Sequence, residues 1–591
     1  MPWADLWQLQ ESKPWHCSRC CLQLISSLLL SPAELPVDDS AILASATGTI
    51  RADDVIPCGY GVVRVTAQTG NVLVQSANQE SLVAQKGIFE RRKARRLMLS
   101  LAASLYLICC LALALTRGPW YDEGFLANPS YAWITTGHPG ISILDDSGPF
   151  LPFNQRMSMR GIREHIYAEM PLYVVFLAGW FKVVGFGLVR TRMFTILCGL
   201  VALLSWYSVV RKLTMDAGVA VVTFSLIAID YGYVLRSSEG RMDALSAAFG
   251  FGALAVYLAL RERNFARAVL LSHTCVAASA FTHPNGGMLA FAGLALLTLY
   301  YDRARIRPRH FAIALSPYLV ASAGWGIYIA QDVQAFKAQF RLNSIQGGRL
   351  ETFRSPWNTV KREILERYLD SLGGVGNWSG FKKLKVVIPL SYWAGLAGVL
   401  CIGELRRRKG YLALLLLTVT YFFVLAFTDG RKSQCYVVHI IPLFAALLAA
   451  SIVWLWRKGK VYRPAVAAGV VLLCLIHVGG IFYQARADSY HKSYLPAIRF
   501  LKENTRADQA VIGPGVLGFG LRYPPNLTDD FRLGYLSGQR PDWVVVNDWY
   551  EGWFRSLKKV EPDAYQFVRT RLDNEFVPVY NEAGIVIYRR R

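Results

Sequence analysis

The sequence predicts an α-helical polytopic membrane protein that ends in a small soluble α/β domain. Of its 591 residues, 53% are hydrophobic. They are gathered into long blocks without Asp, Glu, Lys or Arg, as at 97–116, 411–428 and 464–484. A helix needs roughly 20 mainly apolar residues to cross a bilayer. The chain beyond residue 488 lacks such blocks and combines short strand-like and helix-like patterns.

Twelve apolar segments approach the length of a membrane span. They lie at 97–116, 171–186, 193–210, 218–236, 244–261, 266–282, 286–301, 310–330, 385–404, 411–428, 436–455 and 464–484. The segment 171–186 is short, and we interpret it as re-entrant or interfacial. A hidden additional span beside it is the alternative. We therefore expect about 12–13 transmembrane helices.

The net charge of +23 comes from Lys and Arg in short connectors between apolar blocks, so it indicates membrane topology rather than a nucleic-acid partner. The most basic connectors are 91–96, 261–267, 302–309, 406–409 and 457–463. The positive-inside rule places these connectors in the cytoplasm. We therefore expect the loops 117–170 and 331–384, and also the C-terminus, on the opposite side.

This pattern divides the chain into three parts. Residues 1–90 form an N-terminal extension, residues 91–487 form the membrane domain, and residues 488–591 form the outer α/β domain. Within the outer domain we expect helices at 497–504 and 565–572, strands at 510–512 and 543–546, and a hairpin of 575–580 with 584–589.

We assign no function to the N-terminal extension, residues 1–90. Disorder and a translation start placed too far upstream are two interpretations of it. A small hairpin of 62–65 with 71–74 around Thr69-Gly70 is a local alternative.

Two adjacent carboxylates, Asp122 and Glu123, follow the first span directly. One of them could deprotonate a hydroxyl nucleophile, or the pair could order a metal ion. An ordinary solvated pair at the membrane boundary is the competing interpretation.

Further ionisable residues fall in the predicted outer connectors: Glu169, Arg241, Asp243, His283, Arg431 and Lys432. Asp243 could simply cap a helix, and His283 before Pro284 could be a structural histidine. Arg431 and Lys432 break the basic-inside pattern, so we expect exposed loop cations that hold an anionic group.

Four segments resemble the GT-C membrane glycosyltransferases: Trp120–Gly140 (WYDEGFLANPSYAWITTGHPG), Ala168–Tyr173 (AEMPLY), Arg241–Asp243 and Lys432–Pro442. The closer similarity is to the dolichyl-phosphate-mannose–protein mannosyltransferases and the lipid A aminoarabinose transferases. It covers roughly residues 95–590.

The resemblance implies a hexosyl- or pentosyltransferase of the cell envelope that uses a polyprenyl-phosphate-linked sugar. The acceptor would be a hydroxyl or phosphate of a glycan, lipid or protein, on the periplasmic face of a bacterial inner membrane. It also implies site roles: Asp122 and Glu123 catalytic; Arg241, Arg431 and Lys432 at the donor phosphate; Glu169 and His283 at a metal or the phosphate; Asp243 and Tyr436 as further candidates. A divalent metal ion is an optional cofactor.

The chain departs from the lipid A transferases at Glu169-Met170-Pro171, where they have Lys-Pro-Pro, so its acceptor need not be lipid A. A transporter or lipid flippase is the alternative function, because many spans with charges also fit a transporter. Against it, the sequence has no evident repeat, and its charges gather at span ends.

Overall fold

A computed structural model describes residues 55–58, 61–68, 71–75, 92–346, 351–375 and 380–591, and every structural statement below refers to these residues. The chain divides into two units, Met1–Lys86 and Gly87–Arg591, each described by itself. In the first unit, β1 (Val55–Cys58), β2 (Gly61–Gln68) and β3 (Asn71–Gln75) form an antiparallel sheet. The predicted hairpin is thereby confirmed, while the rest of the extension lies outside the described residues.

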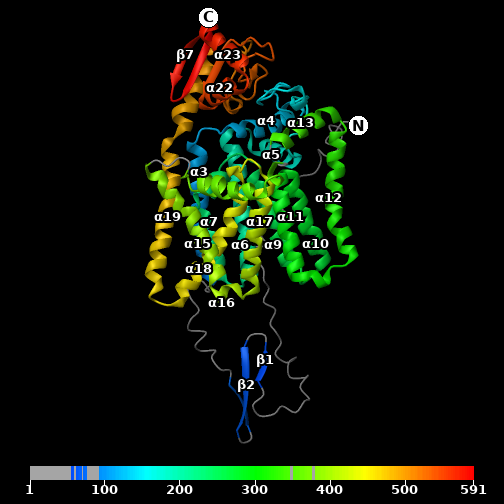
Figure 1. The fold of residues 1–591 in the computed structure, drawn as a ribbon, viewed down its shortest axis with the longest axis vertical. Coiled ribbons are helices and arrows are strands. Elements are labelled where there is room, and N and C mark those ends of the chain that lie inside the picture. The colour runs from blue at the N-terminus through cyan, green and yellow to red at the C-terminus, as the bar shows by residue number, and fades with distance from the viewer. Residues whose placement is uncertain (1–54, 59–60, 69–70, 76–91, 347–350, 376–379) are drawn as a thin grey trace. The chain divides into compact units, whose positions relative to one another are not determined.

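The second unit is dominated by a helical bundle (Figure 1). Nine described helices are long and apolar enough to cross a membrane. They contain α3 (Arg92–Thr116), α6 (Leu188–Thr214), α9 (Asp243–Leu260), α10 (Phe265–Thr282), α12 (Pro308–Ile329), α15 (Val387–Cys401), α17 (Lys409–Thr428), α18 (Val437–Lys458) and α19 (Tyr462–Ala487). The chain is thus an integral membrane protein, as predicted.

Each of the other three predicted segments is also helical, but none is a straight span of this kind. The helices α7 (Ala217–Ile229) and α8 (Tyr231–Ser237) form a pair bent by 64°. The helix α11 (Pro284–Asp302) falls outside the nine. The helix α5 (Pro171–Val184) has 14 residues, a length of about 21 Å at 1.5 Å per residue, too short for a bilayer core of about 30 Å.

Burial separates the centre of the bundle from its edge. In α18, 83% of the apolar window is buried, whereas none of that of α12 is. A helix that is apolar all round is stable either in a protein core or against lipid. The helix α18 therefore forms the centre of the membrane domain, and α12 stands at its flank (Figure 1).

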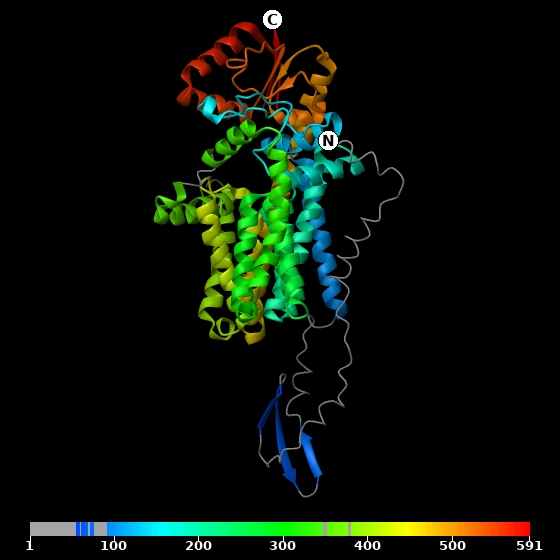
Figure 2. The ribbon, with the colours of Figure 1, turned by 90° about the vertical axis from the view of Figure 1, so that its right-hand side faces the viewer.

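Shorter elements lie between the spans. They are α4 (Tyr121–Thr136), η4 (Gln155–Met157), η5 (Arg303–Arg305), α13 (Val333–Gln346), η6 (Glu351–Phe353), α14 (Pro356–Arg362), the π-helix η7 (Glu363–Leu372), η9 (Gly380–Val386), α16 (Gly403–Arg406) and η10 (Gln434–Tyr436). Figure 2 shows α4 and its neighbours at the end of the bundle that carries the C-terminal domain.

The C-terminal domain contains a five-stranded mixed sheet in the order β5-β4-β6-β8-β7. Its strands are β4 (Val511–Ile512), β5 (Leu527–Thr528), β6 (Trp543–Asn547), β7 (Phe576–Glu582) and β8 (Ile585–Arg590). Its helices are η11 (Tyr490–Tyr494), α20 (Leu495–Asn504), η12 (Gly515–Leu517), α21 (Gly518–Leu521), α22 (Asp548–Val560) and α23 (Pro562–Glu575). The predicted α/β character and the hairpin β7–β8 are present, and α22 was not predicted.

The C-terminal domain packs directly on α4, the first helix after α3. A Cβ atom added at Gly124 would lie 2.8 Å from the backbone of Gly515, so only glycine permits this approach. The hydroxyl of Tyr523 also donates to the Gly124 carbonyl at 2.7 Å. The domain therefore fixes the helix that carries the two predicted catalytic carboxylates.

Candidate active site

Glu123 lies in the first turn of α4 and is completely buried. Its carboxylate accepts two hydrogen bonds from Arg192, at 2.8 and 2.7 Å, and the backbone N–H groups of Trp120 and Gly240, each at 2.7 Å. Arg192 also donates to three carbonyls of the segment 114–118. Burial alone would raise the pKa of Glu123, but Arg192 and these hydrogen bonds hold it below its usual value. All the bonding capacity of Glu123 is used within the protein.

Its neighbour Asp122 has a different environment. Its side chain is 39% exposed and forms an ion pair with Arg241. Arg241 also donates from Nε to Asp243 at 2.9 Å, and its guanidinium lies 4.9 Å from the ring centroid of Trp120. One arginine thus links a carboxylate at the start of α4 to another at the start of α9. Asp122 remains accessible to a ligand.

Glu169 completes this group from the segment that precedes α5. Its side chain is half-buried with Oε2 shielded from solvent, and this desolvation raises its pKa to about 8. Arg241 opposes this rise, while Asp122 and Asp243 add to it. At neutral pH, Glu169 is therefore mostly protonated and can donate a hydrogen bond.

Several buried polar atoms around this group have no hydrogen-bond partner among the described residues. They are Glu169 Oε2, Asp243 Oδ1, Asn285 Oδ1, His439 Nε2 and the hydroxyl of Tyr173. Buried polar atoms are almost always paired, so such a set indicates a place where water or a ligand supplies the partners. We call the residues Asp122, Glu169, Arg241 and Asp243 the open cluster.

His283 and Tyr436 lie beside the open cluster. The Tyr436 hydroxyl is 3.3 Å from His283 Nε2, and His283 Nδ1 accepts the N–H of Asn285 at the start of α11. Both His283 and His439 are close enough to Asp243 to interact with it electrostatically. The structure thus places six of the nine predicted site residues in or beside the open cluster.

Sequence reasoning did not select His439 or Asn285. His439 lies three residues after Tyr436, on the same face of α18, and a Cβ at Gly286 would approach its Cε1 to 2.9 Å. Asn285 directly follows the His283-Pro284 junction. Helical spacing and adjacency to the other candidates were the available signals.

The expectation of two exposed loop cations is wrong for Lys432. Its side chain is buried, lies 3.3 Å from Glu363 and donates to the Ala426 carbonyl at 2.5 Å. Arg431, the preceding residue, is exposed. The partner of Lys432 comes from the distant segment 363–372, which the local sequence could not reveal.

Lys432 belongs to a second ionic group. Arg367 donates to Glu363 at 2.6 Å, to Asp429 at 2.8 Å and to the Ser433 carbonyl. Glu363, Arg367 and Asp429 are all buried, and Arg367 lies 5.7 Å from the ring centroid of Tyr436. We call Glu363, Arg367, Asp429 and Lys432 the closed cluster.

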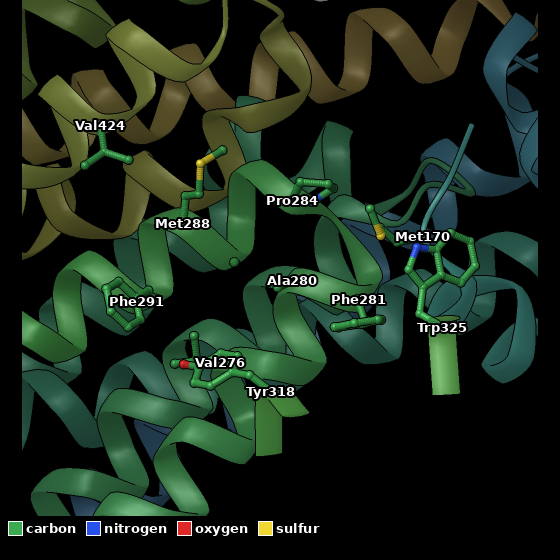
Figure 3. A pocket seen from close by; sticks show the side chains of 11 residues that line it. Met170, Val276, Ala280, Phe281, Pro284, Met288, Phe291, Tyr318, Trp325 and Val424 are labelled. Carbon is green, nitrogen blue, oxygen red and sulfur yellow. The ribbon is translucent and has the colours of Figure 1, made fainter. Parts of the chain in front are cut away.

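An apolar groove of about 540 Å³ lies in the membrane domain, with Met170 and Pro284 among its lining residues (Figure 3). Its lining residues come mainly from α10, α11, α12 and α17, and they are Met170, Val276, Ala280, Phe281, Pro284, Gly287, Met288, Phe291, Tyr318, Trp325 and Val424. Met170 directly follows Glu169, and Pro284 directly follows His283. The apolar groove is therefore lined by the sequence neighbours of Glu169, in the open cluster, and of His283 beside it.

The carboxylates here do not fit a conventional metal site. Asp122 and Asp243 are both engaged by Arg241. No group of three His, Cys, Asp or Glu side chains converges on one point within the described part of the chain. We therefore derive no step through a metal ion.

Comparison with known proteins identifies the fold. No protein-family model and no curated protein sequence matches the chain. Among solved structures, apo ArnT from Cupriavidus metallidurans superposes with a TM-score of 0.56 at 14% identity, over 83% of this chain and 97% of that one. The protein has the GT-C fold. The predicted fold class is thereby confirmed.

Two further GT-C structures are similar. ArnT from the same organism, bound to undecaprenyl phosphate, gives a TM-score of 0.52 at 14% identity, again over 83% and 97% of the two chains. AglB from Archaeoglobus fulgidus, in complex with an inhibitory peptide and a dolichol-phosphate, gives 0.44 at 14% identity over 83% and 74%.

Proposed function

We propose that the protein transfers a sugar from a polyprenyl-phosphate-linked donor to an acceptor on the periplasmic face of a bacterial inner membrane. The observation that carries the proposal is the apolar groove whose lining residue Met170 directly follows Glu169 of the open cluster. A polyprenyl phosphate has matching chemistry, a long apolar chain joined to an anionic head. ArnT, which shares the fold, has been crystallised with such a lipid.

In this proposal the isoprenoid chain lies in the groove between α11 and α12. The phosphate binds Arg241, since guanidinium groups make strong charge-assisted hydrogen bonds to phosphate. Protonated Glu169 donates a further hydrogen bond. Exposed Arg431 adds positive charge at the edge of the phosphate site. Lys432 instead stabilises the closed cluster.

The reaction is a single displacement at the anomeric carbon. The acceptor oxygen forms a bond to that carbon as the bond to the phosphate oxygen breaks, and the electron pair leaves with the polyprenyl phosphate. Arg241 stabilises this charge, because fixed cations are most effective where charge develops. The acceptor proton passes to Asp122, the exposed carboxylate of the open cluster. Inversion at the anomeric carbon follows.

The environment of Glu123 favours a positioning role over the catalytic role that the resemblance implied. It has no bonding capacity left for substrate, and it holds α4, α6 and the loop before α9 together. Asp122 and Arg241 are oriented by this framework. The acceptor in this proposal is a hydroxyl or phosphate of a glycan, lipid or protein, and the sugar is a hexose or a pentose.

The test uses purified protein in nanodiscs with a radiolabelled undecaprenyl-phosphate sugar and a panel of acceptors. We expect transfer of label, and at least tenfold weaker binding of undecaprenyl phosphate in Arg241→Ala. The matched control is Arg571→Ala, which removes a buried arginine of the C-terminal domain. Translocation of the lipid between leaflets without sugar transfer would overturn the proposal in favour of a flippase.

A further inference from the structure

A second ionisable group lies inside the membrane domain, away from the proposed reaction. Asp230 occupies the break between α7 and α8 and is completely buried. It accepts the backbone N–H of Tyr233 at 2.7 Å and the hydroxyl of Tyr392, from α15. An ionisable side chain at membrane depth is costly and usually serves a function.

His477 of α19 is the third partner, and its protonation follows from its contacts. Its Nδ1 accepts the backbone N–H of Tyr231 at 2.9 Å, so this nitrogen carries no proton. The neutral ring therefore carries its proton on Nε2, which lies 3.5 Å from Asp230 Oδ2. The imidazole binds both the freed backbone of the helix break and the carboxylate at its centre.

The packing of α19 shows that this contact is specific. Only 17% of the apolar window of its helical segment is buried, and His477 is one of three buried residues of α19. One turn later, a Cβ at Gly480 would lie 3.1 Å from the Tyr231 ring. Gln484 then donates to the Tyr231 hydroxyl at 3.1 Å. A largely lipid-facing helix thus approaches the protein closely at the start of α8.

The helix α8 leads from this contact to the open cluster. All its residues are buried. Arg236, in its last turn, binds Glu239 at 2.7 and 2.9 Å and lies 5.5 Å from the ring centroid of Trp120. Arg241 follows within the same short connector. The angle at which α8 leaves the break therefore sets the position of the guanidinium groups at the site.

We infer that Asp230, His477 and Tyr392 form a positioning triad that fixes α8, and through it Arg241, relative to α15 and α19. The effect on the donor site rests on the proposed function, whereas the effect on α8 does not. Because α19 continues into the C-terminal domain, the triad also joins that domain to the phosphate-binding arginine.

The experiment compares His477→Ala, His477→Asn and wild-type protein in nanodiscs by hydrogen exchange of peptides covering residues 230–241. We expect faster exchange in His477→Ala, since the Tyr231 N–H loses its acceptor. The asparagine variant should restore protection in part, because its amide oxygen can accept that N–H. His310→Ala is the matched control. It removes an imidazole that accepts the backbone N–H of Arg307 at the start of α12, and it should leave this region unchanged.

Binding of undecaprenyl phosphate, measured on the same samples, tests the link to the donor site. We expect an affinity about 3- to 30-fold weaker in His477→Ala, with partial rescue in His477→Asn. Unchanged exchange in His477→Ala would overturn the triad. Faster exchange with unchanged affinity would overturn its link to Arg241. If wild-type protein does not bind the lipid, the proposed function fails, while the exchange data still decide whether the triad fixes α8.

Discussion

The open and closed clusters contain the same kinds of side chain and differ in how completely their bonds are satisfied. In the closed cluster, Arg367 and Lys432 are shared between Glu363, Asp429 and backbone carbonyls, and none of the four side chains has a buried atom without a partner. In the open cluster, Asp243 and Glu169 each have such an atom, and Asp122 is partly exposed. Unpaired polar atoms are costly unless a ligand completes them. The comparison favours the proposed placement of chemistry in the open cluster, and it indicates a role in stability for the closed one.

The largest effect that would test this comparison is expected at Asp122. Asp122→Asn keeps the shape of the side chain and removes its basicity, so sugar transfer should slow by about 10²–10⁴. Protein yield and thermal stability should change little, because the side chain is partly exposed. Glu164→Gln, at an exposed carboxylate of the same outer loop, is the control. Wild-type turnover of Asp122→Asn would remove Asp122 from the mechanism.

Glu123→Gln should have the opposite effects to Asp122→Asn, a large loss of stability and a small loss of turnover. It leaves the buried Arg192 guanidinium without its carboxylate, a change that typically costs about 3–5 kcal/mol of stability. We expect a marked loss of folded protein, measured by thermal unfolding in detergent. The fraction that folds should retain most of its turnover. A stable but inactive variant would instead assign chemistry to Glu123.

Lys432 and Arg431 are adjacent in one loop, but we expect Lys432 to contribute to stability and Arg431 to contribute to ligand binding. Burial lowers the pKa of Lys432, while Glu363 favours its charge. Lys432→Ala should destabilise the protein, because it removes the lysine partner of buried Glu363. Arg431→Ala should leave thermal stability almost unchanged and weaken binding of undecaprenyl phosphate only a few-fold, since exposed ion pairs are worth about 0–1 kcal/mol. Equal stability of the two variants would contradict the assignment of Lys432 to the closed cluster.

A further effect concerns pH and Glu169. Its pKa of about 8 means that the proton it donates is lost as pH rises through 8. Wild-type affinity for undecaprenyl phosphate should therefore fall by up to about tenfold between pH 7 and pH 9. Glu169→Gln retains a donor and should show a flatter profile. Parallel profiles for the two proteins would exclude this hydrogen bond.

The same shift affects stability with a definite sign. The pKa of Glu169 is higher in the folded protein than in the unfolded chain, so the folded state binds this proton more tightly. The contribution of this proton to the free energy of unfolding is complete below about pH 4.5. It declines as the pH rises to about 8, and above that pH it no longer changes. Glu169→Gln should remove this part of the pH dependence of unfolding.

Much of the fold could be predicted from the sequence because membrane spans are long and locally encoded. Each of the twelve apolar segments is helical, and the short segment 171–186 corresponds to the 14-residue α5. In the C-terminal domain, α22 was missed although Tyr550, Phe554 and Leu557 recur at helical spacing on its buried face. The strand β4 was predicted at 510–512, whereas β5, of two residues, is too short to show a periodicity.

The site was less predictable because the role of each ionisable side chain depends on partners that are far away in the sequence. Adjacent residues Asp122 and Glu123 look equivalent in the chain, and Arg192, 69 residues later, makes one of them structural. Glu363, which pairs with Lys432, likewise gives that lysine a structural role. Local spacing identifies which residues are ionisable, while burial and pairing decide their role.

The contact between Gly124 and the C-terminal domain has a consequence for how the protein is made. The helix α4 is synthesised early, but Gly515 and Tyr523 leave the ribosome almost 400 residues later. Until the last segment has been synthesised and has folded, α4 lacks the surface against which it packs. An unfinished chain therefore holds the start of α4, with Asp122 and Glu123, without its C-terminal support. Under the proposed function, we expect sugar transfer only after the C-terminal domain has folded onto α4.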